Sequence, residues 1–448
     1  MKLFSLLVLA LSTGAAVAAD NPFAKHGRLR VAKSGTYLEH ADGTPFFFLA
    51  DTCWAGPALS TEEDWHKYLH DRVKKGFTAI QFNVVSPWRV APTDAQGNIS
   101  YILKGGQLTL HEKFYQRLDA RLKAINDAGL LAVPVLCWSH KRTDAGNLLT
   151  EEQIITLCKL QVARYKEAHV MWILAGDNPY RGADADKWKR IGRAVFGDKT
   201  SALVTTHPTG ENWPWNDWED EKWLSVLGYQ SGHGDSDQTW KWLHSGPPAE
   251  YGKRKAFARP VINLEPPYEG HNGYSSRKPH SDYSTRRAIY WSLLVHPPAG
   301  VTYGAHGVWS WHTKPGEEPT DHPGSGVAKV WSEAIDLPGA GQLKHLRALM
   351  NEVKWHTLRP AQEVVHQNDA PADQYTVCAR AADGTYVVYF PAKTPARLSP
   401  HLSATVADVS LRWFNPRTGE WGRPANADPT RDKLSPPDDN DWVLVMKP

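Results

Sequence analysis

Two acidic residues stand at the ends of apolar stretches, where the catalytic groups of a barrel enzyme are expected. The run that starts at His169 ends at Asp177, and the run that starts at Arg259 ends at Glu265. Each run has the pattern of a buried strand that gives way to a Pro-containing loop. In a barrel of parallel strands, side chains at this edge converge on a ligand from different strands. Two carboxyl groups brought together there can cleave a glycosidic bond.

The two acids are predicted to play different parts in such a reaction. Asp177 follows the fourth predicted strand and Glu265 ends the seventh, and many retaining glycosidases on barrels place the acid/base and the nucleophile at these positions. We therefore assign Glu265 as the nucleophile and Asp177 as the acid/base, with carboxyl groups about 5–5.5 Å apart. Mutual repulsion and unequal burial would separate their pKa values. The structural alternative is that Asp177 caps the following helix and Glu265 pairs with an arginine.

Strand-like and helix-like segments alternate along most of the chain and would position these acids. The predicted strands are residues 46–50, 78–83, 130–137, 169–175, 201–206, 224–229, 261–265 and 300–303. The predicted helices are residues 61–75, 112–127, 151–166, 184–196, 238–244, 282–295 and 327–351. Several of these helices stop at glycine, as at Gly76, Gly129 and Gly197, which is typical of helix ends.

Eight strands, all but the fifth followed by a predicted helix, indicate an α/β fold, a (β/α)8 TIM barrel, which we assign to residues 20–353. The competing architecture is a doubly wound open sheet. That fold usually has fewer units, and the chain has no Gly-rich phosphate loop after its first strand.

The sequence changes character after about residue 354. Residues 374–380, 385–390, 407–414 and 442–446 alternate between apolar and polar side chains, which is typical of antiparallel strands. We therefore predict that residues 354–448 form a small all-β sandwich domain packed on the barrel. This domain either binds glycan or covers an apolar flank of the barrel.

Polar or aromatic residues follow all eight predicted strands and are candidates for binding a substrate. The candidates are Asp51, Trp54, Asn83, Trp138, His140, His207, Gln230, Tyr268, Glu269, Tyr303, His306 and Trp309. His233 stands close behind Gln230, without an assigned role. A single member is only suggestive, because the strand ends of any barrel are polar.

Some of these candidates have structural alternatives. Asp51 either accepts hydrogen bonds from two sugar hydroxyls or caps the next helix. Gln230 and Tyr303 are expected to orient Glu265. Glu269, four residues after Glu265 in a loop, either supports the site from outside or binds a hydroxyl. Trp54 and Trp309 are either stacking platforms or core residues.

Composition narrows the class of partner. The net charge is +3, with 51 Lys and Arg against 48 Asp and Glu, so nothing indicates a nucleic acid partner.

The 20 tryptophans include Trp213, Trp215 and Trp218 in one polar loop. An exposed indole is a stacking surface for a sugar, although packing of loops on the barrel is an alternative for each of them. Exo action is expected if this loop, residues 212–223, and the loop 268–280 wall off the cleft.

The N-terminus has the pattern of a secretory signal peptide over residues 1–19. Lys2 is followed by an apolar run and by small residues around Ala18 and Ala19. We expect a periplasmic or secreted protein without membrane insertion, because the apolar run is too short to span a bilayer.

Cysteine and histidine spacing predicts neither a metal nor another cofactor. His111-Glu112 lacks the second His of a zinc peptidase, and no paired-cysteine motif occurs. Cys137 and Cys158 fall on a predicted strand and the next helix, so they could meet.

Five motifs in order resemble those of the apiosidase-like glycoside hydrolases, family 140 and its relatives, over residues 28 to 350. They are Phe48-Leu-Ala-Asp-Thr-Cys-Trp54, Gly76-Phe-Thr-Ala-Ile-Gln-Phe-Asn83, Trp172-Ile-Leu-Ala-Gly-Asp-Asn178, Asn263-Leu-Glu-Pro-Pro-Tyr-Glu269 and Tyr303-Gly-Ala-His-Gly-Val-Trp309. The C-terminal part resembles a β domain, named for collagen binding, that often follows such barrels.

The resemblance implies the same roles for the two acids, with Asp177 as acid/base and Glu265 as nucleophile. Related barrels usually carry Asn-Glu after the fourth strand, whereas this chain has Gly176-Asp177. Aspartate is one methylene shorter, so its strand end or the substrate must lie closer. The implied substrate is an oligosaccharide or polysaccharide, with apiose-containing pectin suggested by the family name.

Two other functional classes compete with a hydrolase. A non-catalytic carbohydrate-binding protein is disfavoured because both acids are present. A peptidase or collagen adhesin is disfavoured because the chain has no Gly-x-Ser-x-Gly elbow and no His-Glu-x-x-His motif. The sugar, the linkage and the oligomeric state stay open.

Overall fold

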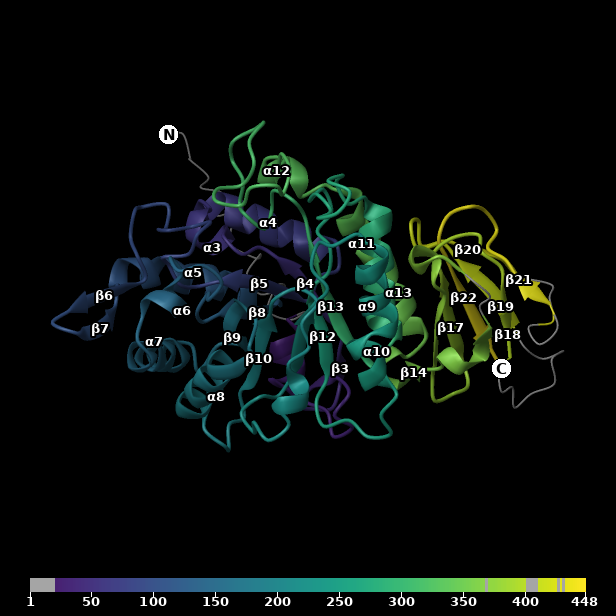
Figure 1. Ribbon diagram of the computed structural model, residues 1–448, viewed down its shortest axis with the longest axis horizontal. Helices are drawn as coiled ribbons and strands as arrows, with labels where there is room; N and C mark the ends of the chain where they lie inside the picture. Colours follow the sequence, from purple (N-terminus) through teal and green to yellow (C-terminus); the bar gives the residue numbers. More distant parts are fainter. Residues whose placement is uncertain (1–20, 367–369, 400–409, 425–427, 429–431) are drawn as a thin grey trace, which may run out of the picture.

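The computed structural model describes residues 21–366, 370–399, 410–424, 428 and 432–448. A large α/β part and a smaller β-rich part lie side by side (Figure 1). The predicted signal peptide, residues 1–19, falls outside the described residues. Within them, no helix is long and apolar enough to cross a membrane.

Eight parallel strands form the central sheet of the larger part. They are β4 (Phe48–Thr52), β5 (Ala79–Asn83), β8 (Leu131–Val135), β9 (Met171–Asn178), β10 (Leu203–Pro208), β11 (Leu227–Gln230), β12 (Val261–Glu265) and β13 (Pro298–Gly304). Their order is β10-β9-β8-β5-β4-β13-β12-β11. The ends of this sheet meet, since the Val226 amide donates to the Val204 carbonyl at 3.1 Å and the Gly228 amide to Thr205 Oγ1 at 3.0 Å. The prediction of a TIM-like barrel is confirmed.

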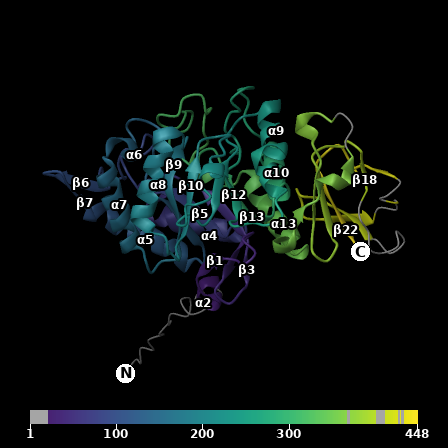
Figure 2. The ribbon, with the colours of Figure 1, turned by 60° about the horizontal axis from the view of Figure 1, so that its bottom comes forward.

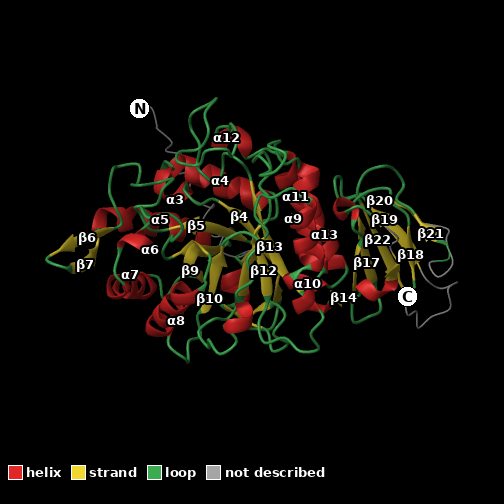
Figure 3. Cartoon of the chain, viewed as in Figure 1, coloured by secondary structure: helices red, strands yellow, loops and turns green. Residues whose placement is uncertain are grey.

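Helices surround the barrel strands (Figure 3). The longer ones are α4 (Glu62–Lys74), α5 (Glu112–Asp127), α7 (Glu151–Arg164), α8 (Gly182–Phe196), α9 (Asp237–Ser245), α10 (Pro247–Gly252), α11 (Asp282–Leu294) and α13 (Pro338–Glu352). Three single turns are α3 (Gly56–Leu59), α6 (Ala145–Leu148) and α12 (Trp331–Ala334). Side-chain caps define several starts: Thr61 Oγ1 accepts the Asp64 amide of α4, and Thr150 and Gln153 form a capping box on α7.

Additional elements extend the barrel at both ends. Helix α2 (Pro22–His26) and the sheet of β1 (Leu29–Val31), β2 (Leu38–His40) and β3 (Pro45–Phe46) lie together below the strands (Figure 2). Phe23 of α2 stacks on His169, just before β9, with ring centroids 4.3 Å apart. A hairpin of β6 (Tyr101–Lys104) and β7 (Gln107–Leu110) projects outward after β5.

Two predicted elements differ from the structure. The predicted helix 327–351 is two helices, α12 and α13. Pro338 begins the second, because proline lacks the amide hydrogen that a helix interior needs but suits its first turn. The connection from β10 to β11 carries no α-helix but only a short 3₁₀ turn at Trp215–Asp217. The predicted strand 224–229 accordingly starts later, at Leu227.

The C-terminal part consists of antiparallel strands. One sheet has the order β14 (Arg359–Pro360), β16 (Val377–Arg380), β17 (Tyr386–Phe390), β22 (Trp442–Lys447), β19 (Ser410–Phe414) and β20 (Trp421–Pro424). A smaller sheet joins β15 (Val365–His366), β18 (Ala396–Leu398) and β21 (Lys433–Leu434). The all-β prediction is confirmed, with β14, β15, β18, β20 and β21 as strands that were not predicted. Residues 407–409 of one predicted strand lie outside the described residues.

The larger β sheet is buried on both faces. On β17, Val387 and Tyr389 belong to the core shared with the barrel, whereas Tyr386, Val388 and Phe390 belong to a separate core within the β domain. This alternation follows from the two-residue period of a strand. The β domain therefore covers an apolar flank of the barrel, one of the two roles predicted for it.

All four cysteines are buried as free thiols. The disulfide between Cys137 and Cys158 that the sequence left open is therefore not formed in this structure.

A buried ion pair joins the β domain to α11. Arg286 Nε and Nη2 donate to Asp441 Oδ2 and Oδ1 at 2.8 and 2.7 Å, and both side chains are almost fully buried. The Tyr389 hydroxyl donates to the same carboxylate at 3.0 Å, and its ring stacks on Tyr290 of α11 with centroids 4.5 Å apart. A buried charge is tolerable only because its partner is positioned this well.

We expect Asp441→Asn to destabilise the protein by about 3 kcal/mol, because it removes the buried carboxylate that pairs with Arg286 and leaves only the more exposed Asp282, 3.1 Å from Nη1, as an ion-pair partner of the guanidinium. Urea unfolding followed by fluorescence measures this. The matched control is Asp439→Asn: Asp439 is 91% exposed and only contacts Lys393, so its loss should cost under about 1 kcal/mol. Equal unfolding midpoints for the two variants would contradict the assigned role of Asp441.

Candidate active site

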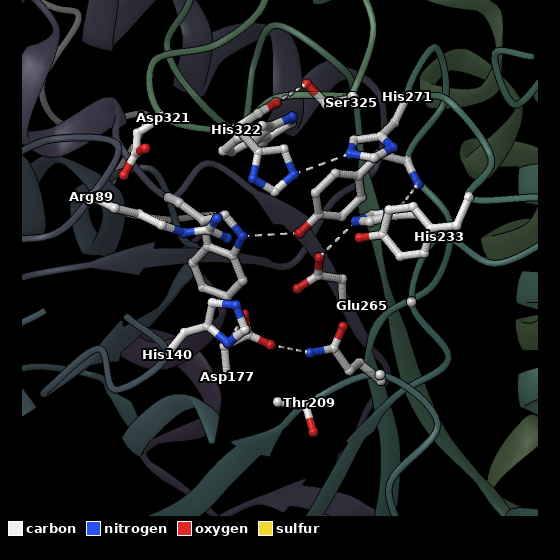
Figure 4. A pocket seen from close by; sticks show the side chains of 18 of the residues that line it. Arg89, His140, Asp177, Thr209, His233, Glu265, His271, Asp321, His322 and Ser325 are labelled. Atoms are coloured by element: carbon white, nitrogen blue, oxygen red, sulfur yellow. Dashed lines mark hydrogen bonds and ion pairs between the residues drawn. The ribbon is translucent and has the colours of Figure 1, made fainter. Parts of the chain in front are cut away.

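A pocket of about 410 Å³ lies at the carboxyl ends of the barrel strands, and Figure 4 shows its side chains. The loops after β5, β8, β9, β11, β12 and β13 contribute to its lining. Eight of the predicted site residues line it: Trp54, Trp138, His140, Asp177, Gln230, Glu265, Tyr268 and Trp309. The barrel therefore brings both predicted acids into one cavity.

Asp177 is the last but one residue of β9, and its backbone lies in the left-handed region, at a φ of 57°. Aspartate is among the few non-glycine residues that adopt this conformation. Gln230 Nε2 donates to Asp177 Oδ1 at 2.8 Å, and His140 Nδ1 lies 3.4 Å from Oδ2. The alternative role as a helix cap is wrong, because Arg181 occupies the N-cap position of α8. Asp177 is thus held in the pocket by two polar side chains.

Aromatic rings close the inner end of the pocket beside Asp177. A Cβ built on Gly176 would lie only 2.4 Å from Trp138 Cε3, so glycine at this position lets the indole lie against the strand. Trp54 packs edge-on against Trp138, with centroids 5.0 Å apart, and its Nε1 donates to the Tyr268 hydroxyl at 2.9 Å. All three aromatic side chains are 2–3% exposed, so the inner wall is apolar and rigid.

Glu265 ends β12 and contacts two histidines. His233 Nε2 lies 2.9 Å from Oε1 and His207 Nε2 lies 3.2 Å from Oε2. Burial alone would raise the pKa of Glu265, but the polar contacts of His207 and His233 outweigh burial and hold the pKa well below its usual range. The alternative of an arginine partner for Glu265 is wrong. The carboxyl group is therefore ionised at neutral pH.

The protonation of His233 can be assigned from its neighbours. The backbone amide of Tyr268 donates to His233 Nδ1 at 3.3 Å. Because Nδ1 accepts a hydrogen bond, the proton of a neutral imidazole resides on Nε2, which can then donate to Glu265. The position of His233 behind Gln230 predicts that it lies near the cavity but does not reveal which acid it faces.

The two residues expected to orient Glu265 act elsewhere. Gln230 holds Asp177 and also donates to the Pro208 carbonyl at 2.7 Å. The Tyr303 hydroxyl donates to Glu269 Oε2 at 2.6 Å. Both predictions about Glu265 are therefore wrong, because the barrel places each side chain against a different carboxylate.

Six predicted binding residues do not line the pocket: Asp51, Asn83, His207, Glu269, Tyr303 and His306. Asp51 is fully buried 2.8 Å from Arg72 Nε and accepts a hydrogen bond from Tyr68 at 2.6 Å. Asp51 is thus the partner of a buried charge and lies outside the pocket lining, and Ala55 rather than Asp51 is the N-cap residue of the next helix, α3.

The other five also have structural partners. Asn83 Nδ2 donates to the Val85 carbonyl at 2.9 Å. Glu269 accepts the Gly339 amide at 2.9 Å as well as the Tyr303 hydroxyl, and burial raises its pKa to about 7. Glu269 was expected either to support the site from outside or to bind a sugar hydroxyl. In the structure it joins the loop after β12 to the start of α13.

His306 and His207 lie behind the lining. His306 Nδ1 accepts from Trp309 Nε1 at 3.1 Å, and its Nε2 contacts the Gly326 carbonyl at 2.8 Å. His207 is fully buried and reaches the pocket only through Glu265.

The tryptophan-rich loop does not form the pocket wall. Trp215 and Trp218 are buried, and Trp213 packs against Tyr229 and Tyr251. These indoles pack the loop onto the barrel, so packing rather than stacking on a sugar, the second of the two expected roles, holds for all three. The loop 268–280, by contrast, lines the pocket through Tyr268, His271, Tyr274 and Arg277.

The pocket can therefore present two carboxyl groups with different environments to one ligand. Glu265 is kept ionised by imidazoles, while Asp177 receives an amide hydrogen bond and has a histidine nearby. An ionised carboxylate and a second acid in one cavity can act as a nucleophile and a proton donor.

Comparison with known proteins gives two family matches. The model described as "Apiosidase-like, catalytic domain" matches residues 32–357, and that described as "Putative collagen-binding domain of a collagenase" matches residues 359–447. No curated protein sequence matches the chain.

Two solved structures share the fold over almost the whole chain. One, titled "Glycoside hydrolase", is 23% identical with a TM-score of 0.79, covering 95% of this chain and 98% of that chain. The other, a glycoside hydrolase family 5 protein from Bacteroides vulgatus ATCC 8482, is 22% identical with a TM-score of 0.80, covering 95% and 94%.

We expect His233→Ala to raise the pKa of Glu265 toward the ordinary glutamate value of about 4.3, because a donor to the ionised form is lost. A ¹³C NMR titration of labelled glutamate carboxyls, with Glu265→Gln for assignment, measures the shift. His140→Ala is the control, since His140 contacts Asp177 rather than Glu265. A Glu265 pKa that is the same in the native protein and in His233→Ala would refute the assigned hydrogen bond.

Proposed function

The chain belongs to the apiosidase-like family, and on that premise we propose that this glycoside hydrolase is an exported, retaining enzyme that removes a sugar from a polysaccharide side chain. The observation that carries the mechanism is the ionised Glu265 in one pocket with Asp177. Retention requires such a carboxylate nucleophile beside an acid/base.

In the first step, Glu265 attacks the anomeric carbon while Asp177 gives its proton to the departing glycosidic oxygen. A glycosyl ester of Glu265 forms and the leaving group departs as an alcohol. In the second step, Asp177 takes a proton from water, whose oxygen attacks the same carbon and releases Glu265 as carboxylate. The anomeric configuration is inverted twice and thus retained.

The environments of the two acids support this division of roles. The imidazoles of His207 and His233 stabilise the charged form that a nucleophile needs. Asp177 is shorter than the usual glutamate, and its left-handed backbone, together with Gln230 and His140, sets where its carboxyl points. His140 can also contribute a hydrogen bond to the departing oxygen or to a sugar hydroxyl.

The shape of the pocket supports removal of a terminal sugar. Trp54, Trp138 and Tyr268 close its inner end, so a sugar bound there has nowhere to continue inward. The family name suggests an apiosyl unit as the released sugar, and plant or microbial polysaccharides are the substrate class. Export follows from the signal-like residues 1–19.

We expect Glu265→Gln to lower kcat by on the order of a thousandfold or more on the native substrate, since the amide cannot act as nucleophile. A panel of aryl glycosides and plant and bacterial polysaccharides identifies that substrate. Asp177→Asn should slow cleavage of natural linkages but spare the first step on an aryl glycoside with a good leaving group, which needs little acid help.

Asp439→Asn, which lies on the surface of the β domain, controls for nonspecific effects and should keep native activity. Proton NMR of the first product should show the same anomeric configuration as the substrate. Unchanged activity in both active-site variants would refute the two-carboxylate mechanism, and an inverted product would refute retention.

A further inference from the structure

Tyr274 is the one aromatic residue among the large apolar side chains that are exposed in the described part of the chain. It is 51% exposed, and the others in this group are aliphatic. It lines the active-site pocket, whereas the 20 tryptophans supply no comparably exposed ring in the described residues. Because an exposed aromatic surface at a cavity usually marks a contact with a ligand, Tyr274 requires an explanation that core packing does not supply.

Two histidines hold the phenol ring of Tyr274 in place. Edge contacts with His233 (centroids 5.7 Å apart, 87°) and His271 (5.9 Å, 78°) fix the plane of the ring. Because Tyr274 also lines the pocket, this fixed and partly exposed ring is available to a ligand there.

The loop that carries Tyr274 is anchored to the loop after β11. The Tyr274 amide donates to the His233 carbonyl at 3.1 Å. Asp235 Oδ1 accepts the amides of Ser275 and Ser276 at 2.8 and 3.2 Å. A Cβ on Gly273 would lie 2.3 Å from Asp235 Oδ2, so this close approach needs glycine. A ring fixed before binding loses little entropy when a ligand stacks on it.

Two arginines lie near the same ring. Arg89 and Arg277 line the pocket, and their charges act on Tyr274. Neither is within ion-pair distance of a carboxylate in the described residues. Their guanidinium groups are thus available as hydrogen-bond donors to the oxygens of a ligand that lies on the ring, which is how a pocket adds orientation to apolar contact.

Only the part of a substrate that extends out of the pocket can reach the ring of Tyr274. The inner end is closed by Trp54, Trp138 and Tyr268, so the sugar to be released fills it and the rest of the chain leaves through the mouth. We propose that Tyr274 is the stacking platform of a leaving-group subsite, which binds the sugar ring on the far side of the scissile bond. This inference rests on the proposed function, because it assumes cleavage between the two sugars.

The test compares two substrates with the same released sugar. One is the oligosaccharide substrate and the other is the corresponding glycosyl fluoride, whose leaving group has no sugar ring. Tyr274→Ala should lower kcat/KM for the oligosaccharide about tenfold or more, as expected for loss of one buried apolar contact. It should leave kcat/KM for the fluoride within about twofold.

Tyr274→Phe keeps the ring and should retain activity on both substrates. Ile102→Ala is a matched control, because Ile102 is 44% exposed on the β6–β7 hairpin and does not line the pocket. Equal losses on both substrates in Tyr274→Ala, or no loss on either, would overturn the subsite. A structural defect would lower both rates, so the difference between the two substrates is the informative quantity.

Failure of the proposed function gives a different result. If the native protein hydrolyses neither substrate, the hydrolytic mechanism fails, and binding to an array of plant and bacterial oligosaccharides tests the platform directly. The native chain should then bind an oligosaccharide that Tyr274→Ala binds at least about tenfold more weakly. Equal binding by the two proteins, or no binding by the native chain, would overturn the inference.

Discussion

The buried, charged carboxylate of Glu265 needs hydrogen-bond donors around it, and this need determines which side chains surround it in the pocket. Removing a carboxylate from water is costly unless donors replace the water. His207 and His233 contact the Glu265 carboxylate in place of water. The Tyr268 amide donates to Nδ1 of His233, so the proton of the neutral imidazole is on Nε2. The same loop continues to Tyr274, whose amide is held by the His233 carbonyl. The ionisation of Glu265 and the position of Tyr274 at the pocket opening therefore depend on the same contacts of His233.

These contacts need a rigid frame, which comes from outside the pocket. Glu269 joins the loop after β12 to the start of α13 through Tyr303 and the Gly339 amide. Nearby, the Arg286–Asp441 pair and an apolar sheet face join α11 and the barrel to the β domain. The β domain thus packs on the helix layer, and none of its described residues lines the pocket.

The barrel was predictable because its signals are local. Apolar runs, helix caps and terminal glycines repeat along the chain, and each can be recognised without knowing its neighbours in space. The positions of Asp177 and Glu265 followed, since all parallel strands end at one rim. Errors occurred where a local signal has two outcomes. Asp51 and Glu269 stand at strand ends like true pocket residues, but the partners that bury them, Arg72 and Tyr303, come from other elements. Likewise, the loop tryptophans are equally consistent with exposure and with packing.

The amino-acid sequence by itself determined the eight-stranded barrel, the β domain and the two acids at the strand ends, because periodicity and residue type carry that information along the chain. Only the tertiary structure decided which side chains face each acid and which ring stays exposed. His233 rather than Gln230 faces Glu265, and Tyr274 rather than a tryptophan remains at the mouth. These choices depend on how loops far apart in sequence pack against one another, and no local pattern encodes that packing.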